Sequence, residues 1–279
     1  MRHTQMPRWL LIPPGILLVL FLVGVGYLMI ESVRVNEGWG VGNFLNFFER
    51  ADYVQILIRT MVIAVAVTIV CVLLGYPIAW MIARHQGNRN LLMMLVITPW
   101  LVSVVVRTYG WVVILGPRGT INSFLQALGW VDSPLRLIFN TTGVVIGLVH
   151  VFVPFMIISI LAVLLYQDRA LEEASQTLGA SPLKTFVSVT LPISLPGVLS
   201  GCVLVYLLAT GAIVTPLLLG GVRDGMLATQ IYQDVFSVFD YPKASSMAIV
   251  LLLTAFILVI PLQQYEKRVA RRVSGMGVR

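Results

Sequence analysis

Residues 168–192 read DRALEEASQTLGASPLKTFVSVTLP, a polar stretch between two long apolar ones. Asp168 is placed to cap a helix, because a short carboxylate side chain there accepts hydrogen bonds from the first free N–H groups. Glu172 and Glu173 follow in its first turn, where the helix dipole favours negative charge. Gly179 suits the left-handed residue that ends a helix. The sequence therefore predicts a short polar helix that stops at Gly179.

A second short helix is expected directly after this glycine. Ser181 and Pro182 have the residue types of a helix cap and a first helical position. Leu191-Pro192 is expected to end this helix before the next apolar stretch, because proline interrupts helices. Residues 168–192 should therefore form two short helices set at an angle, projecting between two membrane spans and shaped to insert into another protein.

The rest of the chain is mostly apolar. Of its 279 residues, 58% are hydrophobic and 11% charged, whereas a soluble domain is about one quarter charged. A transmembrane helix needs roughly 20 consecutive apolar residues. Intervals of that kind are expected at about 9–30, 60–83, 91–115, 143–165, 197–219 and 245–262. The sequence predicts an all-α membrane protein with six transmembrane helices, forming one domain over residues 1–279.

The first of these intervals is interpreted as a retained span. Its apolar stretch is longer than that of a signal peptide, and Tyr27, Met29 and Glu31 provide no small-residue cleavage site. An even number of spans places both termini on one side. The segments on that side carry the entire formal net charge of +7. By the positive-inside rule both termini and residues 168–192 are cytoplasmic, so the basic charge requires no nucleic acid as partner.

Arg107 is the one charged residue inside a predicted span, and an ionisable group at that depth is a functional candidate. It could line a solute pathway, fix its span through carbonyl groups, or extend towards the membrane surface. Tyr109, Trp111 and Tyr206 could offer ring faces to a passing organic cation. Interfacial anchoring is the alternative for Trp111. His150 is expected to be a packed, hydrogen-bonded residue rather than a ligand.

No catalytic or metal-binding residues are predicted. The chain lacks the Gly-x-x-x-x-Gly-Lys-[Ser/Thr] loop that binds nucleotide phosphates. Cys71 and Cys202 are separated packing residues, so neither a metal site nor redox chemistry is implied. A membrane enzyme would need a cluster of reactive side chains within the spans. A secondary transporter, the other alternative, commonly uses intramembrane acids, and no predicted span contains Asp or Glu.

The spacing within residues 168–192 resembles a known family motif. Glu173-Ala174-Ser175, three residues, Gly179, nine residues, Val189, one residue and Leu191-Pro192 are similar to the EAA loop of binding-protein-dependent ABC importer permeases of type I. Ser175 stands where the motif has a second Ala, and Val189 where it has Ile. Both changes are small, and the spacing is unchanged.

The resemblance implies a function in ATP-driven import. In this family the loop forms coupling helices that sit in a groove of an ATP-binding subunit. Carried over to this chain, the coupling residues are Glu173, Ala174, Ser175, Gly179, Ala180, Leu191 and Pro192. The chain would bind no cofactor, and ATP and Mg would be used by a separate ATPase. The implied assembly contains a second, related permease, two ATPase copies and an extracytoplasmic binding protein, in the bacterial inner membrane.

Further stretches resemble the permeases of spermidine/putrescine-type importers. They are Leu74-Gly75-Tyr76-Pro77-Ile78-Ala79-Trp80, Arg107-Thr108-Tyr109-Gly110-Trp111 and Asp132-Ser133-Pro134-Leu135-Arg136. A polyamine is therefore the expected solute. Amino-acid derivatives, thiamine and ferric iron remain alternatives, because no predicted span provides a carboxylate to pair with an amine.

Overall fold

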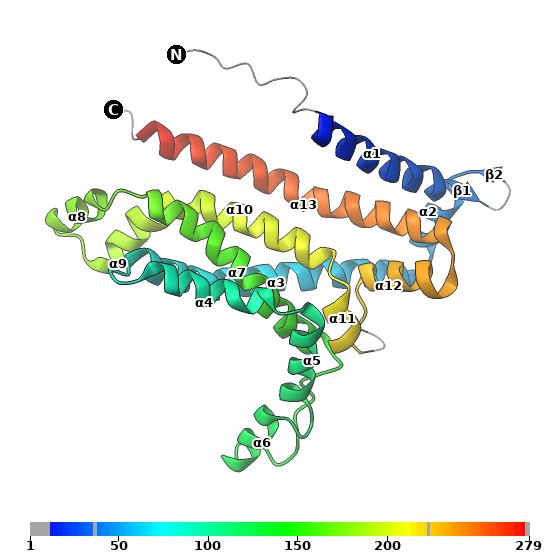
Figure 1. Ribbon diagram of the computed structural model, residues 1–279, viewed down its shortest axis with the longest axis horizontal. Helices are drawn as coiled ribbons and strands as arrows, with labels where there is room; N and C mark the ends of the chain where they lie inside the picture. Colours follow the sequence, from blue (N-terminus) through cyan, green and yellow to red (C-terminus); the bar gives the residue numbers. More distant parts are fainter. Residues whose placement is uncertain (1–11, 36–37, 222–223, 277–279) are drawn as a thin grey trace.

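A computed structural model describes residues 12–35, 38–221 and 224–276, and this part is almost entirely helical (Figure 1). Two short antiparallel strands, β1 (Arg34–Val35) and β2 (Gly38–Trp39), form the one sheet in it. The first helices are α1 (Ile12–Ser32), α2 (Gly42–Glu49), α3 (Ala51–Arg84), α4 (Arg89–Leu101), α5 (Val104–Leu115), α6 (Thr120–Ala127) and α7 (Thr141–Tyr166). They continue with α8 (Ala170–Thr177), α9 (Pro182–Thr185), the π-helical turn η2 (Phe186–Thr190), α10 (Leu191–Thr210), α11 (Val214–Leu219), α12 (Leu227–Gln233), the π-helical turn η3 (Asp234–Val238) and α13 (Tyr241–Met276).

The core forms where α7 packs against α3 and α10. Met156 of α7 is fully buried there. Glycines on the neighbouring helices make room for it, since a Cβ at Gly75 would lie 3.0 Å from Met156 Cγ and one at Gly201 2.6 Å from its Sδ. Close approach of backbones at small residues is typical of membrane helix packing. The apolar sequence of these spans thus produces a tight three-helix centre.

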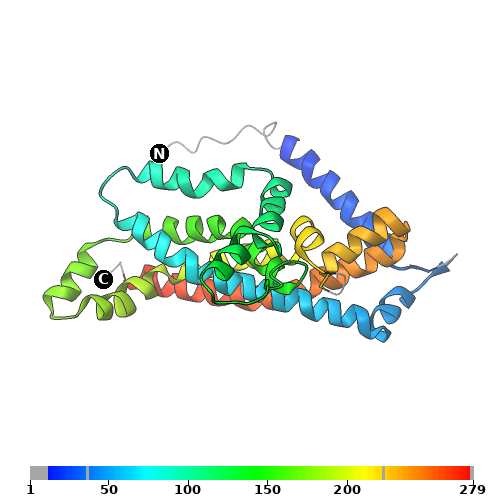
Figure 2. The same cartoon turned by 90° about the horizontal axis from the view of Figure 1, so that it is seen from below.

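The two ends of the bundle differ in what they carry. Figure 1 shows α8, α9 and the C-terminal end of α13 at one end, and α2, the β strands and α12 at the other. The first end carries the segment predicted to be cytoplasmic, and we call the opposite end the outer end. In Figure 1 α5 and α6 leave the bundle as an arm, and in Figure 2, seen from below, this arm overlaps the middle of the bundle.

Five helices are long and apolar enough to cross a membrane in the described part, and α4 with the α5–α6 arm forms a sixth span if this bent pair counts as one. The third span expected at 91–115 is broken between α4 and α5, because the pair is bent by 88°. Pro99 removes one backbone donor in α4, and extended backbone at Val102 ends that helix. The first residues of the first predicted span, 9–11, lie outside the described residues.

Two other predicted spans differ from the helices observed. The helix α3 starts at Ala51, well before residue 60, so that its outer part also carries charged residues. The span expected at 197–219 is interrupted, because α10 ends at Thr210 and α11 begins at Val214. The ranges 143–165 and 245–262 fall within α7 and α13.

The expected stop at Leu191-Pro192 is wrong. Helical backbone continues from Pro182 through η2 into α10, giving one apolar helical stretch from Pro182 to Thr210. Pro192 lies at the start of α10, directly after η2. The wider hydrogen-bonded turn of η2 accommodates the join.

Candidate functional site

The projecting pair of helices is formed by residues 168–192, hereafter the coupling segment. Asp168 Oδ1 accepts a hydrogen bond from Ala170 N at 2.9 Å, where α8 begins. Gly179 ends it with φ of +85°, the left-handed conformation expected from the sequence. Ser181 Oγ then accepts from Lys184 N at 3.3 Å. Local residue choice therefore accounts for the turn between α8 and α9.

The tip of the coupling segment is exposed and partly apolar. Leu178 is 89% exposed and Leu183 74% exposed, at the two sides of the turn. Glu173 and Ala174 on α8 are exposed as well. Large apolar side chains held outside a core commonly mark a contact surface for another protein. This tip lies at the end of the bundle, away from the membrane-spanning core (Figure 1).

Glu172 ties the coupling segment to the end of α3. Its Oε1 accepts from Arg84 Nη2 in an ion pair, from Gln167 Nε2 at 3.1 Å and from Thr190 Oγ1 at 2.7 Å. Arg169 Nη2 also donates to the carbonyl of Ala83 at 3.1 Å. Charge-assisted bonds of this kind are the stronger ones. Sequence reasoning assigned Glu172 only to the helix dipole and missed this role, which depends on a residue far along the chain.

A second connection runs through Phe186 in η2. Its ring packs edge-on against Tyr76 at 5.6 Å and Trp80 at 6.4 Å between centroids. The Tyr76 hydroxyl also forms a hydrogen bond of 2.8 Å with Ser194 Oγ. Movement of the coupling segment is therefore linked to both α3 and α10.

The four residues predicted to line the pathway lie on two helices, α5 and α10, and make different contacts. Tyr206 is buried in α10, and its hydroxyl donates to Met61 Sδ at 2.9 Å. Tyr109 is exposed on α5. Trp111 Nε1 donates to His150 Nδ1 at 3.0 Å, so His150 is packed and hydrogen-bonded as expected. Arg107 has two shielded nitrogen atoms, Nε and Nη1, without a partner in the described part of the chain.

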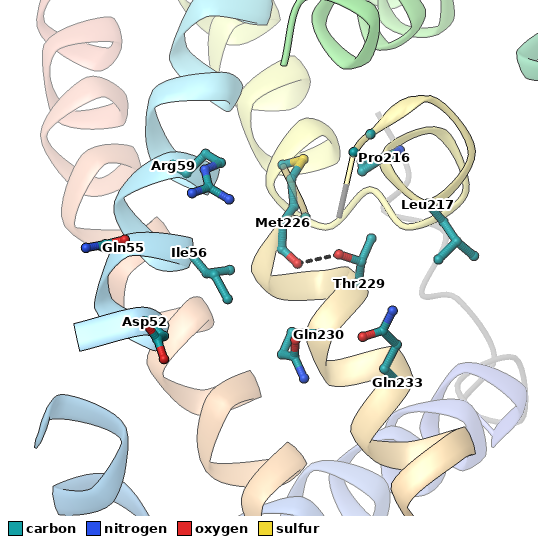
Figure 3. Close-up of a pocket in the computed structure, with 13 residues that line it drawn as sticks. Asp52, Gln55, Ile56, Arg59, Pro216, Leu217, Met226, Thr229, Gln230 and Gln233 are labelled. Atoms are coloured by element: carbon teal, nitrogen blue, oxygen red, sulfur yellow. Dashed lines mark hydrogen bonds between the residues drawn. The ribbon is translucent and has the colours of Figure 1, made fainter. Parts of the chain in front are cut away.

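A pocket of about 760 Å³ opens instead at the outer end, and we call it the outer pocket (Figure 3). Its volume lies within the range of small-molecule sites. Figure 3 shows α3 on one side and α12 on the other. The lining residues are Asp52, Gln55, Ile56, Arg59, Pro216, Leu217, Gly220, Gly221, Gly225, Met226, Thr229, Gln230 and Gln233. None of the four predicted pathway residues belongs to this set.

Sequence reasoning missed the outer pocket because it began the second span at residue 60. Asp52, Gln55, Ile56 and Arg59 have the spacing of one helical face, a signal that was present in the sequence. The opposite wall of the outer pocket, formed by α12, could not be predicted from helical spacing. It depends on a buried hydrogen bond of 2.8 Å from Leu227 N to Thr60 Oγ1, which holds the start of α12 against α3.

The architecture defines a class before any comparison. The protein has several helical spans, a polar pair of helices that projects at one end, and a pocket at the other end. This is the organisation of a transport permease. The chain belongs to the family of binding-protein-dependent transport system inner membrane components, whose profile matches residues 72–275.

Individual relatives agree with this family. The chain is 31% identical over 260 residues to the spermidine/putrescine transport system permease protein PotB of Salmonella typhimurium, covering 92% of this chain and 90% of that protein. It is 28% identical over 265 residues to the molybdenum transport system permease protein ModB of Mycobacterium bovis, covering 92% and 94%. The fold matches a chain of a bacterial ABC transporter for alginate import with a TM-score of 0.73 at 20% identity, covering 94% and 96%.

Proposed function

We propose that this chain is the permease subunit of an ATP-driven importer, in which it forms half of the translocation pathway for a polyamine such as putrescine or spermidine. The observation that carries this proposal is the coupling segment. It projects from the bundle with an exposed tip, and its base is bonded to α3 through Glu172 and Arg84. A force applied at the tip would reach the spans through these contacts.

The tip would dock on a separate ATPase subunit. Exposed Glu173, Ala174 and Gly179, with Ser175 and Ala180 beside them, form the surface that would enter a groove of that subunit. Leu191 and Pro192 begin α10 and would pass the motion into the membrane. ATP and Mg would bind the ATPase, whose nucleotide-driven closure would switch the permease between inward-open and outward-open states.

The complete importer would contain two permeases, two ATPases and a binding protein. A related second permease would complete the pathway, and the binding protein would deliver solute at the outer end. The positive segments at the opposite end support a bacterial inner-membrane orientation. The family description itself names both the inner membrane and dependence on a binding protein.

The polyamine assignment rests on similarity to the PotB protein over most of both chains. The ModB relative supports a second candidate, an anion importer of the same class, at slightly lower identity. The two candidates differ in the charge of the solute, and so one experiment can separate them.

The test is copurification of the tagged chain with the products of neighbouring genes, followed by ATPase assays in lipid vesicles. Binding proteins loaded with putrescine, spermidine or molybdate would be added in turn. Stimulation of ATP hydrolysis by a polyamine-loaded protein is expected. A chain that purifies without any ATPase would refute the importer assignment, and stimulation by molybdate alone would refute the polyamine assignment.

A further inference from the structure

We propose that the outer pocket is a cation-recognition site, in which the carboxylate of Asp52 receives an ammonium group of the solute. This inference rests on the proposed function, and it supplies the carboxylate that the predicted spans lack. Asp52 lies in the first turn of α3 and lines the pocket from one side (Figure 3).

Asp52 differs from Asp224 and Asp234, two other acidic residues at the outer end. Asp224 Oδ1 accepts from Thr141 Oγ1 at 2.7 Å, and Asp234 is paired with Lys243 Nζ at 3.0 Å. Asp52 has no hydrogen bond or ion pair within residues 12–35, 38–221 and 224–276. Its carboxylate is therefore available to a ligand in the pocket.

The opposite wall adds hydrogen-bond acceptors. Gln230 Nε2 donates to Asp234 Oδ1 at 3.3 Å, which leaves the Gln230 carbonyl oxygen as its remaining polar group. Thr229 donates its hydroxyl hydrogen to Met226 O at 2.6 Å and keeps its oxygen lone pairs. An ammonium group carries only donors. Acceptors on α12 facing a carboxylate on α3 therefore suit a primary amine.

Among the described lining residues the one basic side chain, Arg59, lies further along α3 from the outer end than Asp52. Arg59 is on the same face of α3 as Asp52, about 10 Å further along the helix axis, and it is engaged in an interaction of its own. Its charge repels a cation from the inner part of the pocket. The ammonium group is therefore held at the outer mouth, where a binding protein would release its solute.

The test uses the complete importer in proteoliposomes and measures uptake of labelled spermidine delivered by its binding protein. Asp52→Asn removes the charge with little change of shape and is expected to lower uptake about tenfold, the loss of one charge-assisted hydrogen bond. Asp52→Glu should retain most of the uptake. Asp132→Asn is the matched control, because Asp132 is an exposed acid in another outer segment and does not line the pocket.

A second readout separates recognition from a structural role. Asp52→Asn should copurify with the ATPase in wild-type amounts, since the coupling segment lies at the other end of the bundle. Equal loss of ATPase copurification and uptake would overturn the inference, and so would normal spermidine uptake by Asp52→Asn.

The same experiment distinguishes this inference from the proposed function. Wild-type uptake of spermidine together with an unaffected Asp52→Asn variant would overturn the cation site alone. The alternative result is that the wild-type importer takes up molybdate and not spermidine, with faster molybdate uptake by Asp52→Asn. That result would overturn both the cation site and the polyamine assignment.

Discussion

The two ends of α3 are built differently. At the inner end Arg84 is bonded to Glu172, which also accepts from Gln167 and Thr190, so that four side chains from separate elements meet on one oxygen atom. At the outer end Asp52 opens on a pocket and makes no such bonds within the described part of the chain. A dense polar network holds a fixed geometry, whereas an open carboxylate can accept a ligand. One helix thus connects an end suited to transmitting force with an end suited to receiving solute.

The largest effect is expected from Gly179→Arg at the inner end. Its φ of +85° disfavours any side chain with a Cβ, and arginine would also occupy the docking tip. Uptake in proteoliposomes should fall more than tenfold, while membrane insertion stays normal. Gly129→Arg is the control, because Gly129 also has positive φ and open surroundings but lies after α6. Similar losses in both variants would point to backbone strain rather than coupling.

A smaller effect is expected from Glu172→Gln, which tests the inner network directly. The neutral amide leaves the partly buried Arg84 without its counter-charge, and we expect a loss of roughly 1–3 kcal/mol in stability. Thermal unfolding of the purified complex would measure it. Glu173→Gln should leave stability unchanged because Glu173 is exposed. Adding Arg84→Gln should recover part of the loss; no recovery would show that the ion pair is not the cause.

The smallest effect is expected at the outer end, from Thr60→Val. Valine keeps the shape of the buried Thr60 but removes the acceptor for Leu227 N, and we expect a loss of about 1–2 kcal/mol. Thermal unfolding would measure this change. Thr68→Val provides the control, since Thr68 bonds only within its own helix, to Ala64 O. Equal effects of the two substitutions would argue against a special role for the wall formed by α12.

Sequence reasoning succeeded where neighbouring residues decide the structure. Gly179 and Ser181 could be assigned to a turn and a cap because the chemistry involved spans only a few residues. It failed where distant parts of the chain meet. The bond from Leu227 to Thr60 and the ion pair of Arg84 with Glu172 depend on tertiary packing, which no local pattern encodes.

The positions of charged residues also gave wrong ends for the predicted helices. Arg59 marked the expected start of the second span, yet α3 continues outward past it to Ala51. A helix outside the bilayer can carry charge freely, so that the end of an apolar run marks the membrane boundary and not the end of the helix. The outer pocket lies in the part of α3 that this reasoning left out.

The continuity of η2 with α10 has a mechanical consequence. From Pro182 to Thr210 the backbone forms one helical stretch of 29 residues, or about 43 Å at the usual rise per residue. A small rotation of this long helical stretch about one end displaces its other end by a larger distance. Tilting it by roughly 5° about its inner end would carry Thr210 sideways by about 4 Å, less than one helical turn. That distance is comparable to the width of a methylene chain, so a small rotation at the coupling segment would be enough to open or close a narrow pathway.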